Sequence, residues 1–152
     1  MKRIILLAFL CTTTLVMAQR INHVQEAIAN YDYEAALTLI AKEKPTIPLL
    51  LQKGKAQRGL GMNTEALSTY QEIITNDTAN TRAYIEAAEC CRSLAKYQQA
   101  LKYYEQALDL NPENKYVRIQ YIGLLLSLQK FQDALGESSL MTAVSYTHLR
   151  AH

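Results

Sequence analysis

The sequence is poor in residues that interrupt helices: its 152 residues include only three prolines and five glycines, and tryptophan is absent. A chain with so few helix breakers, and rich in Ala, Leu, Gln and Glu, favours helical structure. Hydrophobic residues make up 49% of it, which suits one ordinary domain with a core. Charged residues make up 20% and both signs are interspersed, so the composition does not predict disorder.

An excess of one charge is also lacking. The formal net charge is +2. Lys2 and Arg3 lie in a segment with the pattern of a signal peptide, and Arg150 lies in a tail that looks foreign. Without these three residues the net charge is −1. No run of Lys and Arg lines one face. Binding to nucleic acid, which depends on clustered positive charge, is therefore not predicted.

Cysteine is scarce as well, and two of the three cysteines, Cys90 and Cys91, are adjacent. Neighbouring side chains on a helix point about 100° apart, so this pair cannot form a disulfide without breaking the helix expected there. One interpretation is a redox or metal-binding pair. The interpretation we favour is two small apolar side chains in the core, because cysteine thiols are often buried.

Residues 1–18 have the pattern of a secretory signal peptide. Lys2 and Arg3 form a short basic start, an apolar run begins at Ile4, and Val16-Met17-Ala18 places small residues before a cut at Gln19. A membrane span needs roughly 20 apolar residues, and this run is shorter and rich in threonine. We therefore expect an exported protein, periplasmic or secreted, without stable membrane insertion after cleavage. Anchoring through an uncleaved signal is the alternative.

An internal repeat is the main signal in the remaining chain. Ala66-Leu67 recurs as Ala100-Leu101 and again as Ala134-Leu135, in steps of about 34 residues. Within the stretch that begins at Thr81, small and aromatic residues recur at i, i+4 and i+7, which places them on one face of each of two helices. These residues are Tyr84, Ala88 and Cys91 in the first helix, and Ala100, Tyr104 and Ala107 in the second.

The stretch from Thr81 to Asn114 resembles a tetratricopeptide repeat, whose period is about 34 residues. The residues that carry the resemblance are Tyr84, Ala87-Ala88, Ala100, Tyr104, Ala107 and Pro112. Units that begin at Ile47 and Lys115 resemble the family less closely; in the last, Arg118 replaces the aromatic and Ser138 the second-helix Phe. A partial unit precedes Ile47, and Pro45 and Pro48 shorten its end. The resemblance covers about residues 21–141.

This resemblance implies an all-α fold of helix-turn-helix repeats stacked as an α-solenoid, a right-handed superhelix with a groove. Gly59-Leu60-Gly61 marks one helix end and Pro112 another. We expect residues 1–18 as the signal peptide and 19–143 as an array of about three to four helix pairs, the last of them truncated. The pairs are expected near 22–31 and 33–43, 48–60 and 64–75, 82–94 and 97–110, and 116–128 and 131–141.

The last nine residues, 144–152, read Val-Ser-Tyr-Thr-His-Leu-Arg-Ala-His and are not expected to continue the helix. They resemble the translation of a transposon-derived sequencing adapter, residue for residue. This predicts a non-native tail and a natural protein that continues beyond Ala143. A genuine polar tail is the alternative.

Little in the sequence could form a catalytic site. Without the tail and the signal peptide, His23 is the only histidine, and no C-x2-C spacing or Gly-rich phosphate loop occurs. Glu86 and Glu89 are expected on a solvated helix face. The sequence therefore predicts neither an enzyme nor a bound cofactor or metal.

The resemblance implies a binding surface instead, on the concave side lined by the first helix of each unit. By helical geometry this face holds the second, fifth, ninth and twelfth residues of a unit. Leu51, Ile85 and Ile119 would form an aliphatic ladder, for which packing between repeats is the alternative. The candidate partner-binding residues are Leu51, Lys55, Arg58, Arg82, Ile85, Glu89, Arg92 and Ile119. Family members that hold a C-terminal carboxylate use Lys and Asn at the fifth and ninth positions, and this chain does not.

Two functional hypotheses are open. The first is a non-catalytic scaffold that binds a peptide or protein partner on the concave face. The second is an accessory segment of a larger secreted enzyme whose catalytic domain lies outside this sequence.

Overall fold

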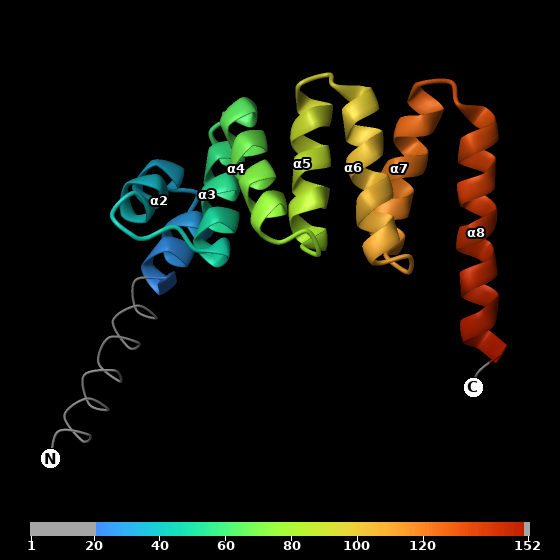
Figure 1. Cartoon of the computed structure of the whole chain (residues 1–152), viewed down its shortest axis with the longest axis horizontal. Coiled ribbons are helices and arrows are strands. Elements are labelled where there is room, and N and C mark those ends of the chain that lie inside the picture. The colour runs from blue at the N-terminus through green and yellow to red at the C-terminus, as the bar shows by residue number, and fades with distance from the viewer. Residues whose placement is uncertain (1–20, 151–152) are drawn as a thin grey trace, which may run out of the picture. The chain divides into compact units, whose positions relative to one another are not determined.

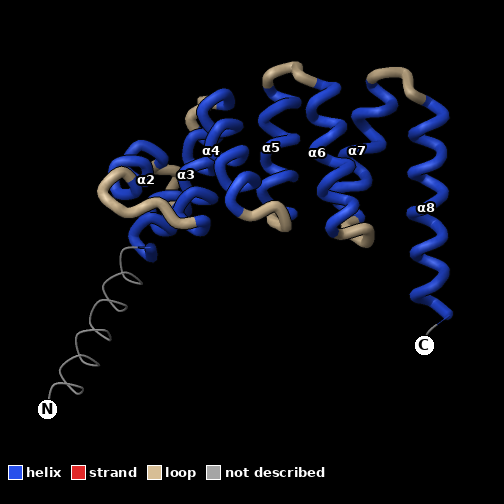
Figure 2. Tube along the Cα trace, viewed as in Figure 1, coloured by secondary structure: helices blue, strands red, loops and turns tan. Residues whose placement is uncertain are grey.

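The computed structural model describes residues 21–150, with side chains described for 21–141, so the expected signal peptide lies outside the described residues. Every regular element in this range is a helix (Figure 2). Residues 21–29 are helical. The later helices are α2 (Tyr33–Ile40), α3 (Ile47–Gly59), α4 (Asn63–Asn76), α5 (Thr81–Ser93), α6 (Tyr97–Leu110), α7 (Lys115–Ser127) and α8 (Phe131–Arg150).

The chain divides into two compact units, and the boundary falls inside α4, between Thr69 and Tyr70. In the first unit, α2 packs against α3. Its core combines the helix at 21–29 with both of these helices, through Val24, Ile28, Ala36, Ile40, Leu49 and Ala56. The apolar residues thus recur at helical spacing and meet in one cluster.

In the second unit, α5 and α6 form one antiparallel helix pair, and α7 and α8 form the next (Figure 1). The residues that the repeat placed on the inner faces are buried: Tyr84, Ala88, Cys91, Ala100, Tyr104 and Ala107. Small alanines allow the helices to approach closely, and the tyrosine rings fill the remaining space. Cys90 and Cys91 are both buried and no disulfide involves either, which agrees with their interpretation as core residues.

The turn inside each helix pair has the same geometry. One residue takes a left-handed conformation: Tyr31 at φ 61°, Gly61 at 75°, Ala95 at 56° and Gln129 at 59°. The next N–H then bonds back to the preceding helix, as from Lys96 to the Cys91 carbonyl at 2.8 Å. Gly61 takes this conformation without strain, whereas the other three residues take it with a side chain. Gly59 remains inside α3, where a Cβ would overlap the ring of Tyr33.

Two expected boundaries are wrong. α2 ends at Ile40 rather than near residue 43, and it has 8 residues where α4 and α6 have 14. At the other end, α8 continues to Arg150. This corrects the expected end near 141 and, for residues 144–150, the expectation that the tail leaves the helix; residues 151–152 lie outside the described residues. Residues 141–150 contain no proline or glycine, so nothing in them interrupts a helix. The resemblance of 144–152 to an adapter concerns the sequence alone and stays a prediction.

Candidate functional site

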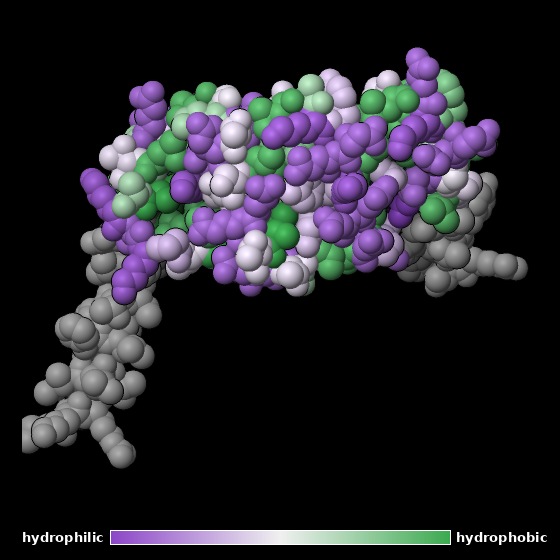
Figure 3. All heavy atoms as spheres, turned by 45° about the horizontal axis from the view of Figure 1, so that its top comes forward, coloured by the Kyte–Doolittle hydropathy of each residue, from purple (hydrophilic) through white to green (hydrophobic). Residues whose placement is uncertain are grey.

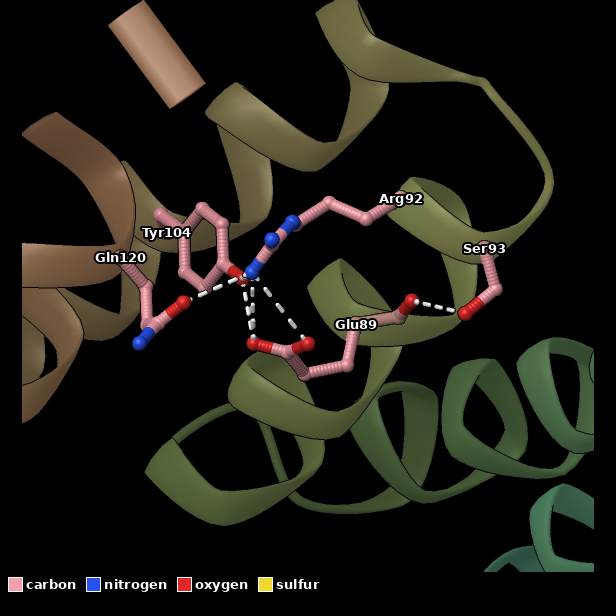
Figure 4. A network of polar contacts seen from close by, with 5 residues as sticks. All are labelled: Glu89, Arg92, Ser93, Tyr104 and Gln120. Atoms are coloured by element: carbon pink, nitrogen blue, oxygen red, sulfur yellow. Dashed lines mark hydrogen bonds and ion pairs between the residues drawn. The ribbon is translucent and has the colours of Figure 1, made fainter. Parts of the chain in front are cut away.

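A hydrogen-bonded network joins three helices of the second unit around the guanidinium of Arg92 on α5 (Figure 4). Its Nη1 donates to Oε1 of Gln120 on α7 at 2.7 Å and to the hydroxyl of Tyr104 on α6 at 3.3 Å. Glu89, one turn earlier on α5, lies 3.5 Å from the same nitrogen. The Tyr104 hydroxyl donates to Oε1 of Glu89 at 2.5 Å. The network therefore holds α5, α6 and α7 together on one side.

The surroundings of Tyr104 and Arg92 in this network raise the pKa values of both groups. Burial raises the pKa of the Tyr104 hydroxyl, and its hydrogen bond to the Glu89 carboxylate raises it further, so Tyr104 remains a donor well into the alkaline range. The pKa of Arg92 is also raised, first by its hydrogen bond to Tyr104. Tyr116 precedes Gln120 by one turn of α7, so it lies on the side of the helix that faces Arg92.

One sequence-based expectation needs correction here. The sequence places Glu86 and Glu89 on a solvated helix face, but both are half-buried, and Glu89 is bound to Tyr104 and Arg92. Arg92, a candidate partner-binding residue, keeps its side chain 38% exposed, while its guanidinium is held by Glu89, Tyr104 and Gln120. The cause is the tyrosine at position 104: its ring is buried between the helices, and its hydroxyl reaches both charged groups. Sequence reasoning misses Gln120 altogether.

An apolar stripe runs along the solvent side of α7. Tyr116, Ile119 and Leu126 are 57%, 53% and 48% exposed, and they follow i, i+3 and i+10 spacing on one helix face. The opposite face of the helix is already buried, through Val117, Tyr121, Leu124 and Leu125. At Gly123, between Ile119 and Leu126, a Cβ would meet nothing. The stripe is thus not needed for packing within the second unit.

The hydrogen bond from Arg92 to Gln120 brings this side of α7 next to α5, and we call the surface that the two helices share the α5/α7 face. Arg82 is exposed on it and Ile85 is half-buried. The face comprises Arg82, Ile85, Glu89, Arg92, Tyr116, Ile119 and Leu126. It therefore includes five of the eight candidate residues from the sequence, and Tyr116 and Leu126 extend it along α7.

The other three candidates lie on α3 in the first unit. Lys55 is exposed there, and Leu51 and Arg58 are half-buried. All three are on the helix that the repeat pattern assigned to them. A continuous aliphatic ladder from Leu51 through Ile85 to Ile119 stays a prediction, because it spans both units.

The described part of the chain shows no group of three or more His, Cys, Asp or Glu side chains placed to hold a metal ion. Within the same range, no helix is both long and apolar enough to cross a membrane. On the face shown in Figure 3, hydrophobic side chains lie in small groups among hydrophilic ones.

Comparisons with known proteins agree with the repeat architecture. Tetratricopeptide repeat protein 6 of Homo sapiens is 30% identical over 89 residues, which are 59% of this chain and 16% of that protein. The chain thus spans only a small part of this relative. Among solved structures, MamA from Desulfovibrio magneticus RS-1 matches with a TM-score of 0.76 at 14% identity, over 84% of this chain and 75% of MamA.

A second solved structure is the first TPR of Spaghetti (RPAP3) bound to an HSP90 peptide. Its TM-score is 0.69 at 20% identity, over 74% of this chain and 92% of that one. These structural likenesses establish the fold, an all-α solenoid of helix pairs. Two family models described as tetratricopeptide repeat match residues 51–114 and 92–137, which together are more than half of the chain. The chain therefore belongs to the tetratricopeptide-repeat family.

Proposed function

We propose that the protein is a non-catalytic interaction scaffold that binds an extended or helical peptide segment of another protein on the α5/α7 face. One observation carries the proposal: Tyr116, Ile119 and Leu126 are about half exposed along one side of α7, while its core side is already filled. Exposed apolar side chains in a row, rimmed by polar groups, are typical of protein-binding sites.

The charges on this face indicate the kind of segment that would fit. Arg82 is exposed at one end of α5, and Arg92 is held in place by its neighbours near Tyr116. The Arg92 charge is partly balanced by Glu89, so Arg82 is the stronger attraction for an acidic residue. Apolar contacts would supply most of the affinity, whereas the charges would steer approach and orient the partner.

A structural relative supports this choice of partner. The RPAP3 TPR structure contains the HSP90 peptide SRMEEVD, which carries three acidic residues. That protein uses the same repeat architecture and is bound to an acidic peptide. We extend only the class of partner to this chain, because the Lys and Asn of the carboxylate-gripping members are missing at the corresponding positions.

The test compares two double variants in pull-downs from the envelope fraction of the source organism. Arg82→Glu with Ile119→Asp changes exposed groups of the α5/α7 face without touching the Arg92 network. Lys102→Glu with Gln98→Asp makes similar changes on exposed positions of α6. Melting temperatures would show that both variants are folded.

We expect the α5/α7 variant to lose the partners that the wild type retains, most clearly at low salt, where charge steering is strongest. The α6 variant should retain them. Equal recovery of the same partners by the wild type and the α5/α7 variant would contradict the proposed binding face.

A further inference from the structure

The shortness of α2 leaves a hollow in the first unit. α2 ends at Ile40, about two turns earlier than it would if it were as long as α4 or α6. The part of α3 that these two turns would cover is therefore left open. The resulting cavity has a volume of about 350 Å³. Its apolar wall includes Leu37, Ile40, Pro45, Leu49 and Leu50. A cavity of this size lies within the range of small-molecule sites, roughly 300–1,000 Å³.

One polar group in this wall has unused hydrogen-bonding capacity. Gln57 of α3 lines the hollow and is only 7% exposed. Its Oε1 accepts a hydrogen bond from the Thr69 hydroxyl at 2.8 Å. That bond sets the orientation of the amide, and the side-chain nitrogen makes no hydrogen bond to the described residues. This nitrogen is not among the fully buried polar atoms, so it is accessible and can donate to an acceptor placed in the hollow.

A positive charge lies beside this donor. Lys53 precedes Gln57 by one helical turn, so both side chains are on the same side of α3 and both line the hollow. Lys53 has no ion-pair partner in the part of the chain that is described. Lys44 at the rim adds a second positive charge, against one carboxylate, Glu43. The polar end of the hollow therefore favours an anion that accepts hydrogen bonds.

We propose that the first unit binds a small amphiphile, an aliphatic chain that ends in a carboxylate, in the hollow between α2 and α3. The carboxylate accepts hydrogen bonds from the Gln57 amide and the Lys53 ammonium. The aliphatic chain lies against the apolar wall. This site is separate from the α5/α7 face, and its occupation does not depend on the proposed scaffold function.

The experiment uses octanoate as the probe, with octylamine and N-acetyl-leucine amide as comparison ligands. Each is titrated into isotopically labelled protein, and amide chemical shifts are followed by NMR. Lys53→Met removes the charge at the polar end, while Lys42→Met removes an exposed neighbouring charge that does not line the hollow. Unchanged melting temperatures of both variants would confirm that they are folded.

Octanoate should shift amides of residues 37–57, and Lys53→Met should weaken its binding on the order of tenfold, because a charge-assisted hydrogen bond is lost. Lys42→Met should bind as the wild type does. The proposal is overturned if octanoate causes no saturable shifts, if octylamine binds as well, or if the two variants behave alike. Binding of N-acetyl-leucine amide without octanoate binding would also overturn it, in favour of a peptide side chain as the occupant.

Discussion

Single side chains decide how the helix pairs of the second unit are joined. Tyr104 is fully buried, and its hydroxyl lies at the point where three helices meet. At the corresponding position of the next repeat stands Ser138, which bonds within α8, to the Ala134 carbonyl. In that repeat the polar connection between α7 and α8 comes from Arg118 and Glu137 instead, so the two repeats join their helices through different side chains.

The raised pKa of Tyr104 makes stability depend on alkaline pH. In the unfolded chain a tyrosine ionises near pH 10, whereas the folded protein keeps Tyr104 protonated to higher pH. The stabilisation is thus complete below about pH 10 and decreases above it, by up to about 1.4 kcal/mol per pH unit. Tyr104→Phe should flatten this decrease, as measured by urea unfolding between pH 8 and 11.

Tyr97→Phe is the control, because Tyr97 is exposed. Tyr121 contributes in the same direction, since burial and its bond to Glu105 raise its pKa too. In Tyr104→Phe, the decrease of the free energy of unfolding with rising pH should therefore be smaller than in the wild type but still present. A slope equal to that of the wild type would mean that Tyr104 is not held protonated by the fold.

Ala100 is fully buried where α6 packs against α5. Ala100→Leu adds three carbons to a closely packed contact and should lower the free energy of unfolding by roughly 1–3 kcal/mol. Gln98→Leu, on the exposed side of the same helix, should change it little. Denaturant unfolding of both variants measures the difference, and a neutral Ala100→Leu would show that the helices do not cross there.

Among the elements, the turn between paired helices uses the same backbone conformation whatever the residue. Gly61 adopts it without strain, whereas Ala95 and Gln129 adopt it with a Cβ. A left-handed conformation costs a residue other than glycine roughly 1–2 kcal/mol. The turns therefore store unequal amounts of strain, which substitution can relieve or introduce.

Ala95→Gly should stabilise the protein, by about 1 kcal/mol after allowance for the greater flexibility of glycine when unfolded. The reverse change, Gly61→Ala, should destabilise it by a similar amount. A Cβ at Gly61 would meet no atom within 4 Å, so this loss would come from the backbone alone. Thermal unfolding compares the two, and a destabilising Ala95→Gly would refute the strain argument.

The sequence predicts most helices within one or two residues, because the repeat period and the glycine and proline positions constrain them locally. Contacts between residues that are far apart in the sequence are harder to predict. Arg118 is recognisable as a departure from the aromatic pattern, but its bonds to Glu137 on α8 and to the Pro112 carbonyl depend on how α7 and α8 pack. The same holds for Gln120 beside Arg92. The hollow in the first unit likewise depends on where α2 ends, which the prolines after it indicate only roughly.

For the chain as a whole, export is a prediction from residues 1–18. A basic start, a short apolar run and small residues before Gln19 motivate it. N-terminal sequencing of protein purified from its natural source should begin at or near Gln19. An intact Met1 in the mature protein would show that the segment is not removed.

Photo-crosslinking in the source organism tests directly whether a partner binds to the α5/α7 face. A benzophenone amino acid is placed at Tyr116 or, as the matched exposed control, at Lys102 on α6. Cross-linked products are identified by mass spectrometry. We predict a discrete partner from Tyr116, which Arg82→Glu diminishes, and none from Lys102. Products from Lys102 alone, or the same products from both positions, would show that the partner binds elsewhere.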